Sequence, residues 1–479
     1  MLFFALSLQT ALGWGQIKAF PEAEGFGAMV SGGRGGDVHI VTNLNASGTG
    51  SLQWAVSQAG SRIVVFNVSG IITGDLHIPH GDLTIAGQTA TGAGITLVGH
   101  MYTTYGEDIS NIIIRHVRIR PPDPDNQWPS NQHDAIQFST ANHIMLDHID
   151  ASHGADETID FWGGASYITL QHSHLSFPIY DTLNGWTHNK GVINHRPCLD
   201  TGNCQPDDRT GGYISIIKNV FTHARNRTPA LSVGPAEVIN NMVYNGREGF
   251  VHHNVVGGQT NQTDSQFNII SNQYIAGPST SLSPFWFDPE NQTTPIPSAY
   301  WLQDNWVEDP GEYVGLVQNP WEDMAFAEAY TFACCGIGSN QFNQNMAFDF
   351  SNHSEYVSVS VLDENSLELS LLPTIGAHPH DIVARQSISE LAQRNGTWRN
   401  YRPANLMDGL TPAPAPLDSD NDGMPDAWEI QHGLNAQNDN DHNTIMSSGY
   451  TAIELYINSL ASQLSGELIF ADGFESSSN

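Results

Sequence analysis

Lysine is the scarcest charged residue in this 479-residue chain, which contains only Lys18, Lys190 and Lys218. Lys and Arg together number 17 against 50 Asp and Glu, so the formal net charge at pH 7 is -33. A chain this acidic repels polyanions at long range, and we expect no nucleic-acid partner. An anionic ligand therefore has to be captured by a local group of cations or by bridging metal ions.

Cysteine is also rare, and the four residues are Cys198, Cys204, Cys334 and Cys335. Cys198 and Cys204 are close enough in sequence for a local disulfide in an oxidising compartment, and free thiols remain the alternative. No apolar run is long enough to span a bilayer. Residues 1–15 are typical of a secretory signal peptide, so we expect a secreted protein without a membrane span that acts as a monomer.

Short apolar runs that end in His or Asn recur through the middle of the chain. They occupy residues 111–116, 142–148, 167–172, 213–219, 237–241, 266–272 and 300–305. Segments of this kind cannot bury an apolar face alone and have to stack on their neighbours, which predicts a solenoid. We therefore expect an all-β chain folded as a parallel β-helix. His116, His148 and His172 are interpreted as a stacked ladder at successive bends, not as metal ligands.

The two ends of the solenoid differ in pattern. The open N-terminal end needs cover, and residues 51–57 are predicted to form a short capping helix. Residues 383–394 are predicted to be helical and residues 356–362 extended. These patterns divide the chain into a β-helical catalytic domain at 19–410, a Pro-rich linker at 411–417, a small module at 418–462 and a tail at 463–479.

The module opens with a motif that matches the calcium-loop pattern D-x-[DN]-x-[DN]-G-x5-E in full. The candidate ligands are Asp418, Asp420, Asp422, Met424, Asp426 and Glu429, with Met424 at the position that supplies a backbone carbonyl in such loops. A degraded second half follows, with Asp439 and Asp441. We expect an EF-hand-like calcium module with a structural role; a flexible acidic linker is the alternative.

A second charged group lies mid-chain, where Asp134, Asp156, Glu157 and Asp160 precede Lys190 and then Arg225 and Arg227. If the strands stack in register, the acids collect on one edge of consecutive coils. Crowded carboxylates cannot all stay ionised without a cation, which suggests a calcium site. The alternatives are solvated acids in turns, and arginines that form salt bridges with them.

With these residues in place, the chain resembles the secreted pectate lyases, which fold as right-handed parallel β-helices. The resemblance covers residues 19–255 and is carried by 19–27, 32–36, 41–45, 50–52, 83–88, 147–148 and 225–229. It implies cleavage of polygalacturonate, an acidic polysaccharide, by β-elimination with Ca²⁺ as cofactor.

By position, Asp134, Asp156 and Asp160 resemble the calcium ligands of that family, with Glu157 replacing or assisting Asp156. Lys190 is similar to the substrate-binding lysine, and His188 beside it is also a substrate-binding candidate. Arg227 resembles the arginine that removes the C5 proton, and Arg225 is a further substrate-binding candidate.

The chain departs from the family pattern at two places. Gln132 stands where many relatives have another calcium-binding Asp, and Ala230, Leu231 and Ser232 stand where a second cleft arginine is often found. Both departures bear on calcium affinity and substrate preference.

The implied chemistry needs stabilisation of a carboxylate dianion and a base near C5. Arginine is an unusual base because its pKa stays above about 12 in proteins, so Arg227 instead orienting a hydroxide or stabilising charge is an alternative. A β-helical pectin lyase or glycoside hydrolase remains open, the hydrolase needing two or three carboxylates around the scissile bond. So does a non-catalytic glycan-binding protein or adhesin.

Overall fold

The computed structural model describes residues 17–122, 133–179, 188–195, 211–253, 265–279, 282–288, 298–317, 331–333, 346–399 and 401–471. The predictions made for residues 1–15, for Gln132 and for the four cysteines lie outside these ranges.

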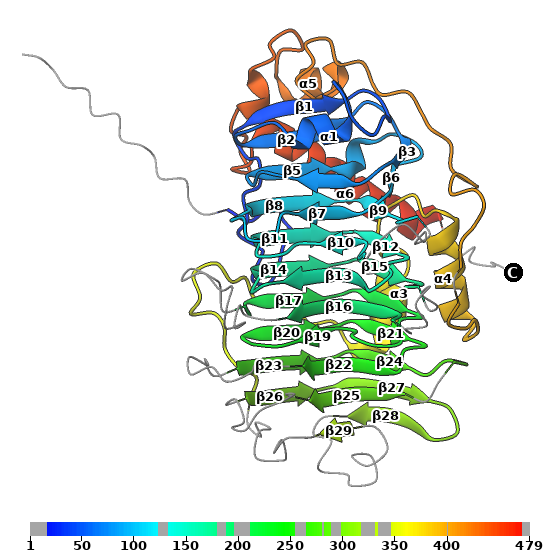
Figure 1. Cartoon of the computed structure of the whole chain (residues 1–479). Coiled ribbons are helices and arrows are strands. Elements are labelled where there is room, and N and C mark those ends of the chain that lie inside the picture. Colours follow the sequence, from blue (N-terminus) through cyan, green and yellow to red (C-terminus); the bar gives the residue numbers. More distant parts are fainter. Residues whose placement is uncertain are drawn as a thin grey trace, which may run out of the picture.

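Three sheets wrap around one long axis, and each coil of the chain visits them in the same order (Figure 1). The first sheet contains β1 (Asp37–Val41), β2 (Arg62–Phe66), β5 (Leu83–Ala86), β8 (Ser110–Arg115), β11 (Asn142–Asp147), β14 (Ser166–Gln171), β17 (Ile214–Ile217), β20 (Ala236–Ile239), β23 (Ser265–Ile270) and β26 (Ser298–Gln303). The second contains β3 (Gly70–Thr73), β6 (Ile95–Val98), β9 (Val117–Ile119), β12 (Asp150–Ser152), β15 (His174–Ser176), β18 (Val220–Thr222), β21 (Met242–Tyr244), β24 (Gln273–Ile275), β27 (Asn305–Asp309) and β28 (Tyr313–Val317). The third contains β4 (Leu76–Ile78), β7 (Met101–Thr103), β10 (Ile136–Gln137), β13 (Glu157–Trp162), β16 (Lys190–His195), β19 (Ala230–Leu231), β22 (Glu248–His253), β25 (Ser283–Asp288) and β29 (Thr331–Ala333). All neighbouring strands among these pair in parallel except β27 and β28, so the prediction of a parallel β-helix is confirmed.

Alternation within each strand builds the interior. In β8, Ile112 and Ile114 point into the coil and belong to its continuous apolar core, whereas Ile113 packs with Phe20 on the outside. The register places Ile112 beside Ile144 of β11, and the same apolar type recurs in column after column. Each coil therefore buries its inward residues only because the next coil covers them.

Two polar ladders mark the bend between the first and second sheets. The rings of His116, His148 and His172 stack with centroid separations of 4.6 and 5.2 Å, which confirms the predicted histidine ladder. All three have positive φ angles near 50°. The position with positive φ is the turn position of each coil, and Lys218 occupies it on its coil with φ 55°. The asparagines of the later coils lie one residue after this turn position; they are Asn219, Asn241, Asn272 and Asn305. In the sequence analysis the histidine position and the asparagine position were treated as the same position of the coil.

The predicted helices at the ends are present. In α1 (Leu52–Val56) the Ser51 side chain accepts the Trp54 N–H at 3.1 Å, and Leu52 and Val56 pack onto the interior of the first coil. The remaining helices are η1 (Gly87–Thr89), η3 (Glu364–Ser366), α3 (Leu367–Leu371), α4 (Ile382–Ala392), α5 (Asp426–His432), η4 (Asp441–Asn443) and α6 (Ala452–Ala471). Residues 356–362 run outside the coils, where Val357 forms one antiparallel bridge with Gly25.

The C-terminal segment folds back onto the N-terminal coils, so that α5 lies beside β1 at one end of the solenoid (Figure 1). Met424 and Ile453 share an apolar cluster with Ile63 and Val65 of β2. The Pro-rich segment 411–417 contacts the N-terminal coils, because the Ala413 N–H donates to the Thr91 carbonyl at 3.3 Å. Within the described ranges, no helix has the length and apolar character needed to cross a membrane.

Candidate active site and calcium sites

Adjacent strands of the third sheet carry the mid-chain charges to one place. Glu157 opens β13 and pairs with Lys190, which opens β16, and Lys190 in turn bridges to Asn226 just before β19. One coil earlier, the Asp134 carboxylate accepts the Glu157 N–H at 2.7 Å. Residues distant in sequence are thus about 4.8 Å apart in successive coils.

Acids and cations meet directly in this cluster. Lys190 Nζ pairs with Asp156 Oδ1 and lies 3.1 Å from Glu157 Oε1. Arg227 Nη1 pairs with the same Glu157 oxygen, and His188 Nδ1 lies 3.0 Å from Asp156 Oδ1. Burial opposes ionisation of Asp156, but the His188 and Lys190 contacts hold its pKa below the usual range.

Among the residues that the structure describes, the deeper acids form no ion pair. Asp134 and Asp160 are 4% and 5% exposed, and burial together with the neighbouring carboxylates raises the pKa of both well above the usual range. Burial also raises the pKa of Glu157, although Arg227 and Lys190 oppose the shift. Asp160 Oδ1 is buried without a hydrogen-bond partner.

These features fit a hard cation better than they fit a set of bare charges. Ca²⁺ prefers carboxylate oxygens, and Asp160 Oδ1 is buried without a donor, whereas Asp134 Oδ1 accepts the Glu157 N–H. Asp156 and Glu157 are engaged by Lys190 and Arg227. Among the described residues, no acid of this cluster belongs to a group of three ligand atoms within 4.8 Å of one another.

Asn189, which was not predicted as a site residue, fixes the backbone at Arg225. Asn189 accepts the Arg225 N–H through its side-chain oxygen at 2.6 Å and through its carbonyl at 2.9 Å. Gly191 permits the close approach of the next coil, because a Cβ there would lie 2.4 Å from the Arg227 carbonyl oxygen. The His-Asn-Lys-Gly segment at 188–191 was the available signal. Within the described ranges the Arg225 side chain forms no ion pair.

The C-terminal loop brings most, but not all, of its predicted ligands together. The carboxylates of Asp418, Asp420 and Asp422 form one group with oxygens within 4.8 Å, and Asp422, Glu429 and Asp441 form another. Burial and mutual repulsion raise the pKa of Asp422 to about 7 and that of Glu429 to about 8.

Two predicted members of this loop are engaged elsewhere. Both Asp426 oxygens bind Ser419, one accepting its N–H and the other its hydroxyl, each at 2.7 Å. The Met424 side chain is fully buried in the apolar cluster with β2, which leaves only its backbone carbonyl as a candidate. Asp441, which the sequence analysis assigned to the degraded second half of the motif, joins Asp422 and Glu429 in one group.

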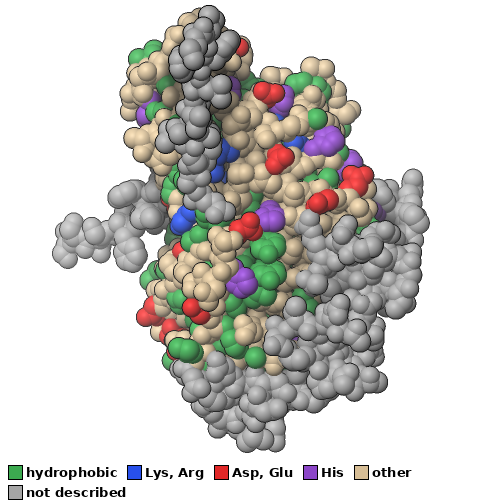
Figure 2. All heavy atoms as spheres, turned by 90° about the vertical axis from the view of Figure 1, so that its left-hand side faces the viewer, with side chains coloured by type: hydrophobic (Ala, Val, Ile, Leu, Met, Phe, Trp, Pro, Cys, Tyr) green, Lys and Arg blue, Asp and Glu red, His purple; other side chains and the backbone are tan. Residues whose placement is uncertain are grey.

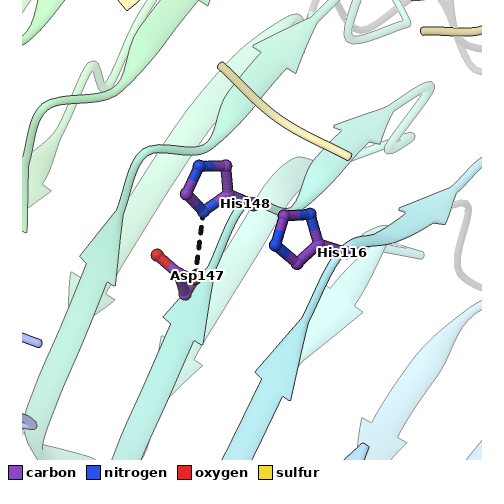
Figure 3. Close-up of side chains that lie close together, drawn as sticks. All are labelled: His116, Asp147 and His148. Atoms are coloured by element: carbon purple, nitrogen blue, oxygen red, sulfur yellow. Dashed lines mark ion pairs between the residues drawn. The ribbon is translucent and has the colours of Figure 1, made fainter. Parts of the chain in front are cut away.

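A third group with ligand-like spacing contains His116, Asp147 and His148, at the ends of β8 and β11 (Figure 3). Asp147 Oδ2 lies 3.0 Å from His148 Nδ1 and 2.8 Å from Arg115 Nε. Burial and the neighbouring His148 lower the pKa of His116 well below its usual value. Arg115 and Asp147 form an ion pair beside the His116–His148 ring stack, and the stack is the part of the ladder interpretation that is confirmed.

The surface offers no broad cationic area on the face shown in Figure 2, where acidic and histidine side chains of the described residues are scattered and basic ones are few. On this face the described residues therefore offer a polyanion little cationic attraction beyond single basic side chains.

The fold and the site define a parallel β-helical protein with lysine, arginine and buried carboxylates gathered on one sheet. No protein-family model matches the chain. Probable pectate lyase C of Aspergillus fumigatus is 33% identical over 448 residues, covering 93% of this chain and 94% of its own. The enzyme of the same name from Emericella nidulans is 30% identical over 446 residues, covering 93% of each chain. A solved structure, that of jun a 1, the major allergen from cedar pollen, aligns with 74% of this chain and 92% of its own at 18% identity and a TM-score of 0.49. The chain belongs to the pectate lyase family, which is a family of polysaccharide lyases.

Proposed function

We propose that this chain is a pectate lyase that cleaves polygalacturonate or a closely related uronan by calcium-dependent β-elimination, with Arg227 removing the C5 proton. The observation that carries the proposal is the meeting of Glu157, Lys190 and Arg227 on three consecutive coils of the third sheet. Family membership supports the same chemistry. We also propose that residues 1–15 direct the export of the protein and that it acts outside the cell as a monomer.

Substrate capture falls to the few cations of the cluster. Lys190 and Arg225 are positioned to bind sugar carboxylates, and Arg225 has no competing ion pair among the described residues. His188 contributes by holding Asp156. Because the whole chain carries a net charge of -33, these contacts have to offset a general repulsion of the substrate.

Calcium would be held by Asp134 and Asp160, with Asp156 or Glu157 completing the set. When bound, the ion supplies positive charge that offsets the charge developing on the substrate carboxylate. The chain's own residues do the remaining work. Lys190 neutralises the carboxylate side of the sugar, and the buried acids keep the cations in a fixed position.

Proton removal requires a nitrogen of Arg227 with a free lone pair. The C5–H proton passes to that nitrogen, and the C5–H electrons form the C4–C5 double bond. The C4–O bond breaks with its electron pair on the oxygen of the leaving sugar, which takes up a proton from water. In the structure Arg227 Nη1 is engaged in an ion pair with Glu157 Oε1. The pair therefore has to open before the reaction, and the raised pKa of Glu157 makes its neutralisation easier.

The test compares Arg227→Ala with Arg225→Ala on polygalacturonate, following both the near-ultraviolet absorbance of unsaturated ends and reducing sugar. We expect Arg227→Ala to lose kcat by at least about a hundredfold while substrate binding persists, since it removes the base. Arg225→Ala, two residues away, should raise KM and change kcat less.

Other outcomes would identify the alternatives. Reducing sugar without the absorbance would mean hydrolysis, and binding without any turnover in the wild-type protein would mean a glycan-binding module. Activity confined to methyl-esterified substrate would mean a pectin lyase. Unchanged turnover in Arg227→Ala would remove that residue from the role of base.

A further inference from the structure

The acids near the C-terminus converge from three separate segments. Asp418, Asp420 and Asp422 precede α5, Glu429 lies within it, and Asp441 opens η4. The two groups of close oxygens share Asp422, which links the carboxylates before α5 to those of Glu429 and Asp441. Ligands of a single calcium ion lie about 2.3–2.6 Å from it, so oxygens within 4.8 Å of one another can share an ion.

Several of these carboxylates are buried with oxygens that receive no hydrogen bond. Glu429 is 0% exposed and neither of its oxygens has a donor. Asp422 is 2% exposed and Asp441 9% exposed, and each leaves one oxygen without a partner. An uncompensated buried carboxylate costs several kcal/mol, so a hard cation is the natural partner for these oxygens.

The other oxygens of the same side chains fix their direction. Asp422 Oδ1 accepts the Met424 N–H at 2.9 Å, which leaves Oδ2 for the cluster. Asp441 Oδ2 accepts the Asn435 N–H at 2.8 Å, which leaves Oδ1. Asp422 and Asp441 are therefore each held through one carboxylate oxygen, and the other oxygen remains without a donor.

The cluster lies against the contact between the C-terminal segment and the first coils. Gly423, between Asp422 and Met424, has a position where a Cβ would meet Val38 and Val65 of the first sheet at 2.8 and 3.2 Å. The buried Met424 next to it packs on β2, and Trp428 of α5 packs against the same apolar cluster. A contact that holds the 418–424 loop to α5 and η4 therefore also holds Met424 and Trp428, which pack on the β-helix.

We propose that Asp418, Asp420, Asp422, Glu429 and Asp441 bind one divalent cation of the calcium type, and that this ion fastens the C-terminal segment onto the outer face of the N-terminal coils. Asp441 replaces Asp426, whose carboxylate is committed to Ser419. The site is separate from the charge cluster around Glu157 and does not rest on the proposed catalytic function.

Hydrogen exchange read by mass spectrometry on the full-length protein tests this, because it reports on α5 separately from the cleft. The protein is compared in calcium, in magnesium and in chelator. We expect calcium to slow exchange in peptides covering 426–432, and magnesium to slow it less because Mg²⁺ demands a tighter octahedral shell. Asp441→Asn and Glu429→Gln should lose the calcium-dependent slowing.

Asp439→Asn is the matched control, since Asp439 is exposed, lies two residues from Asp441 and belongs to neither group of oxygens. Asp420→Asn, at a partly exposed ligand, serves if a buried variant fails to fold. Equal exchange of the wild-type 426–432 peptides with and without calcium would overturn the site. Retention of the calcium effect in Asp441→Asn and Glu429→Gln would overturn the ligand set.

Discussion

Arginine has two distinct environments in this molecule. Arg62, Arg118 and Arg120 are almost fully buried and serve the fold: Arg62 donates to backbone carbonyls, and Arg120 pairs with Asp150 and Asp381. Since Lys and Arg total only 17, structural use of this kind leaves few cations for a ligand. The grouping of Lys190, Arg225 and Arg227 on neighbouring coils is for that reason the most informative distribution of charge in the chain.

The buried acid Asp160 gives a prediction about pH and metal. Its raised pKa means that the folded state binds more protons than the unfolded state, so its contribution to stability falls as pH rises from the unfolded pKa towards the folded one. In chelator at mildly alkaline pH, Asp160→Asn should therefore be more stable than wild type by at least about 1 kcal/mol, the scale of one relieved charge repulsion.

Thermal unfolding with chelator and with calcium measures this effect. Calcium should stabilise the wild type more than it stabilises Asp160→Asn, because the variant has lost a proposed ligand. Asp37→Asn, at an exposed acid of β1 in the first sheet, is the control for general charge. A lower stability of Asp160→Asn than of wild type in chelator at alkaline pH would contradict the prediction.

At the scale of elements, side-chain hydrogen bonds of an asparagine ladder supplement the few backbone hydrogen bonds that short strands can form between coils. Strands such as β18 and β21 have only three residues each. Next to them, Asn219 Nδ2 donates to Asn241 Oδ1 at 3.0 Å, and Asn241 Nδ2 donates to Asn272 Oδ1 at 3.0 Å. Each asparagine also donates to a carbonyl of the preceding coil, so the bend is satisfied without water.

Truncation of a central ladder residue should consequently be costly. Asn241→Ala removes the acceptor of two Asn219 donors and the donor to the Ile216 carbonyl, so we expect a loss of about 2–4 kcal/mol in the free energy of unfolding. Urea unfolding followed by circular dichroism measures it. Asn45→Ala, at an exposed position, should change stability by less than about 0.5 kcal/mol. An equal, small change in both variants would show that the ladder adds no stability.

At the scale of the whole molecule, charge opposes the proposed reaction. A protein of net charge -33 and a polyanionic substrate repel each other until the cleft cations engage. Salt shortens the range of this repulsion from about 30 Å at 0.01 M to about 10 Å at 0.1 M.

We therefore expect kcat/KM on polygalacturonate to rise over that range of sodium chloride at constant saturating calcium, with little change in kcat. Highly methyl-esterified pectin, which carries few charges, is the control substrate. If kcat/KM falls steadily from the lowest salt concentration, local attraction by Lys190 and Arg225 outweighs the net charge of the chain.

The fold was predictable because a β-helix repeats one local rule. A run of β-branched residues ending in His or Asn needs no distant information to predict a coil, and α1 and α4 followed from equally local patterns. The acids and cations around Glu157 were also accessible from sequence, since parallel register brings residues one coil apart into contact. The one-residue offset between the histidine and asparagine ladders was not, because both end the same kind of run.

By itself, the sequence determined the stacking of coils, the scarcity of cations and the identity of the charged residues in the cluster. Only the tertiary structure decided which acids are paired and which are bare: Glu157 faces Arg227, whereas Asp160 has an oxygen without a partner. It alone brought Asp441 beside Glu429 and placed both against the first coils. The reason is physical, since strand periodicity is a property of neighbouring residues, whereas burial and the approach of separate segments depend on how the whole chain closes on itself.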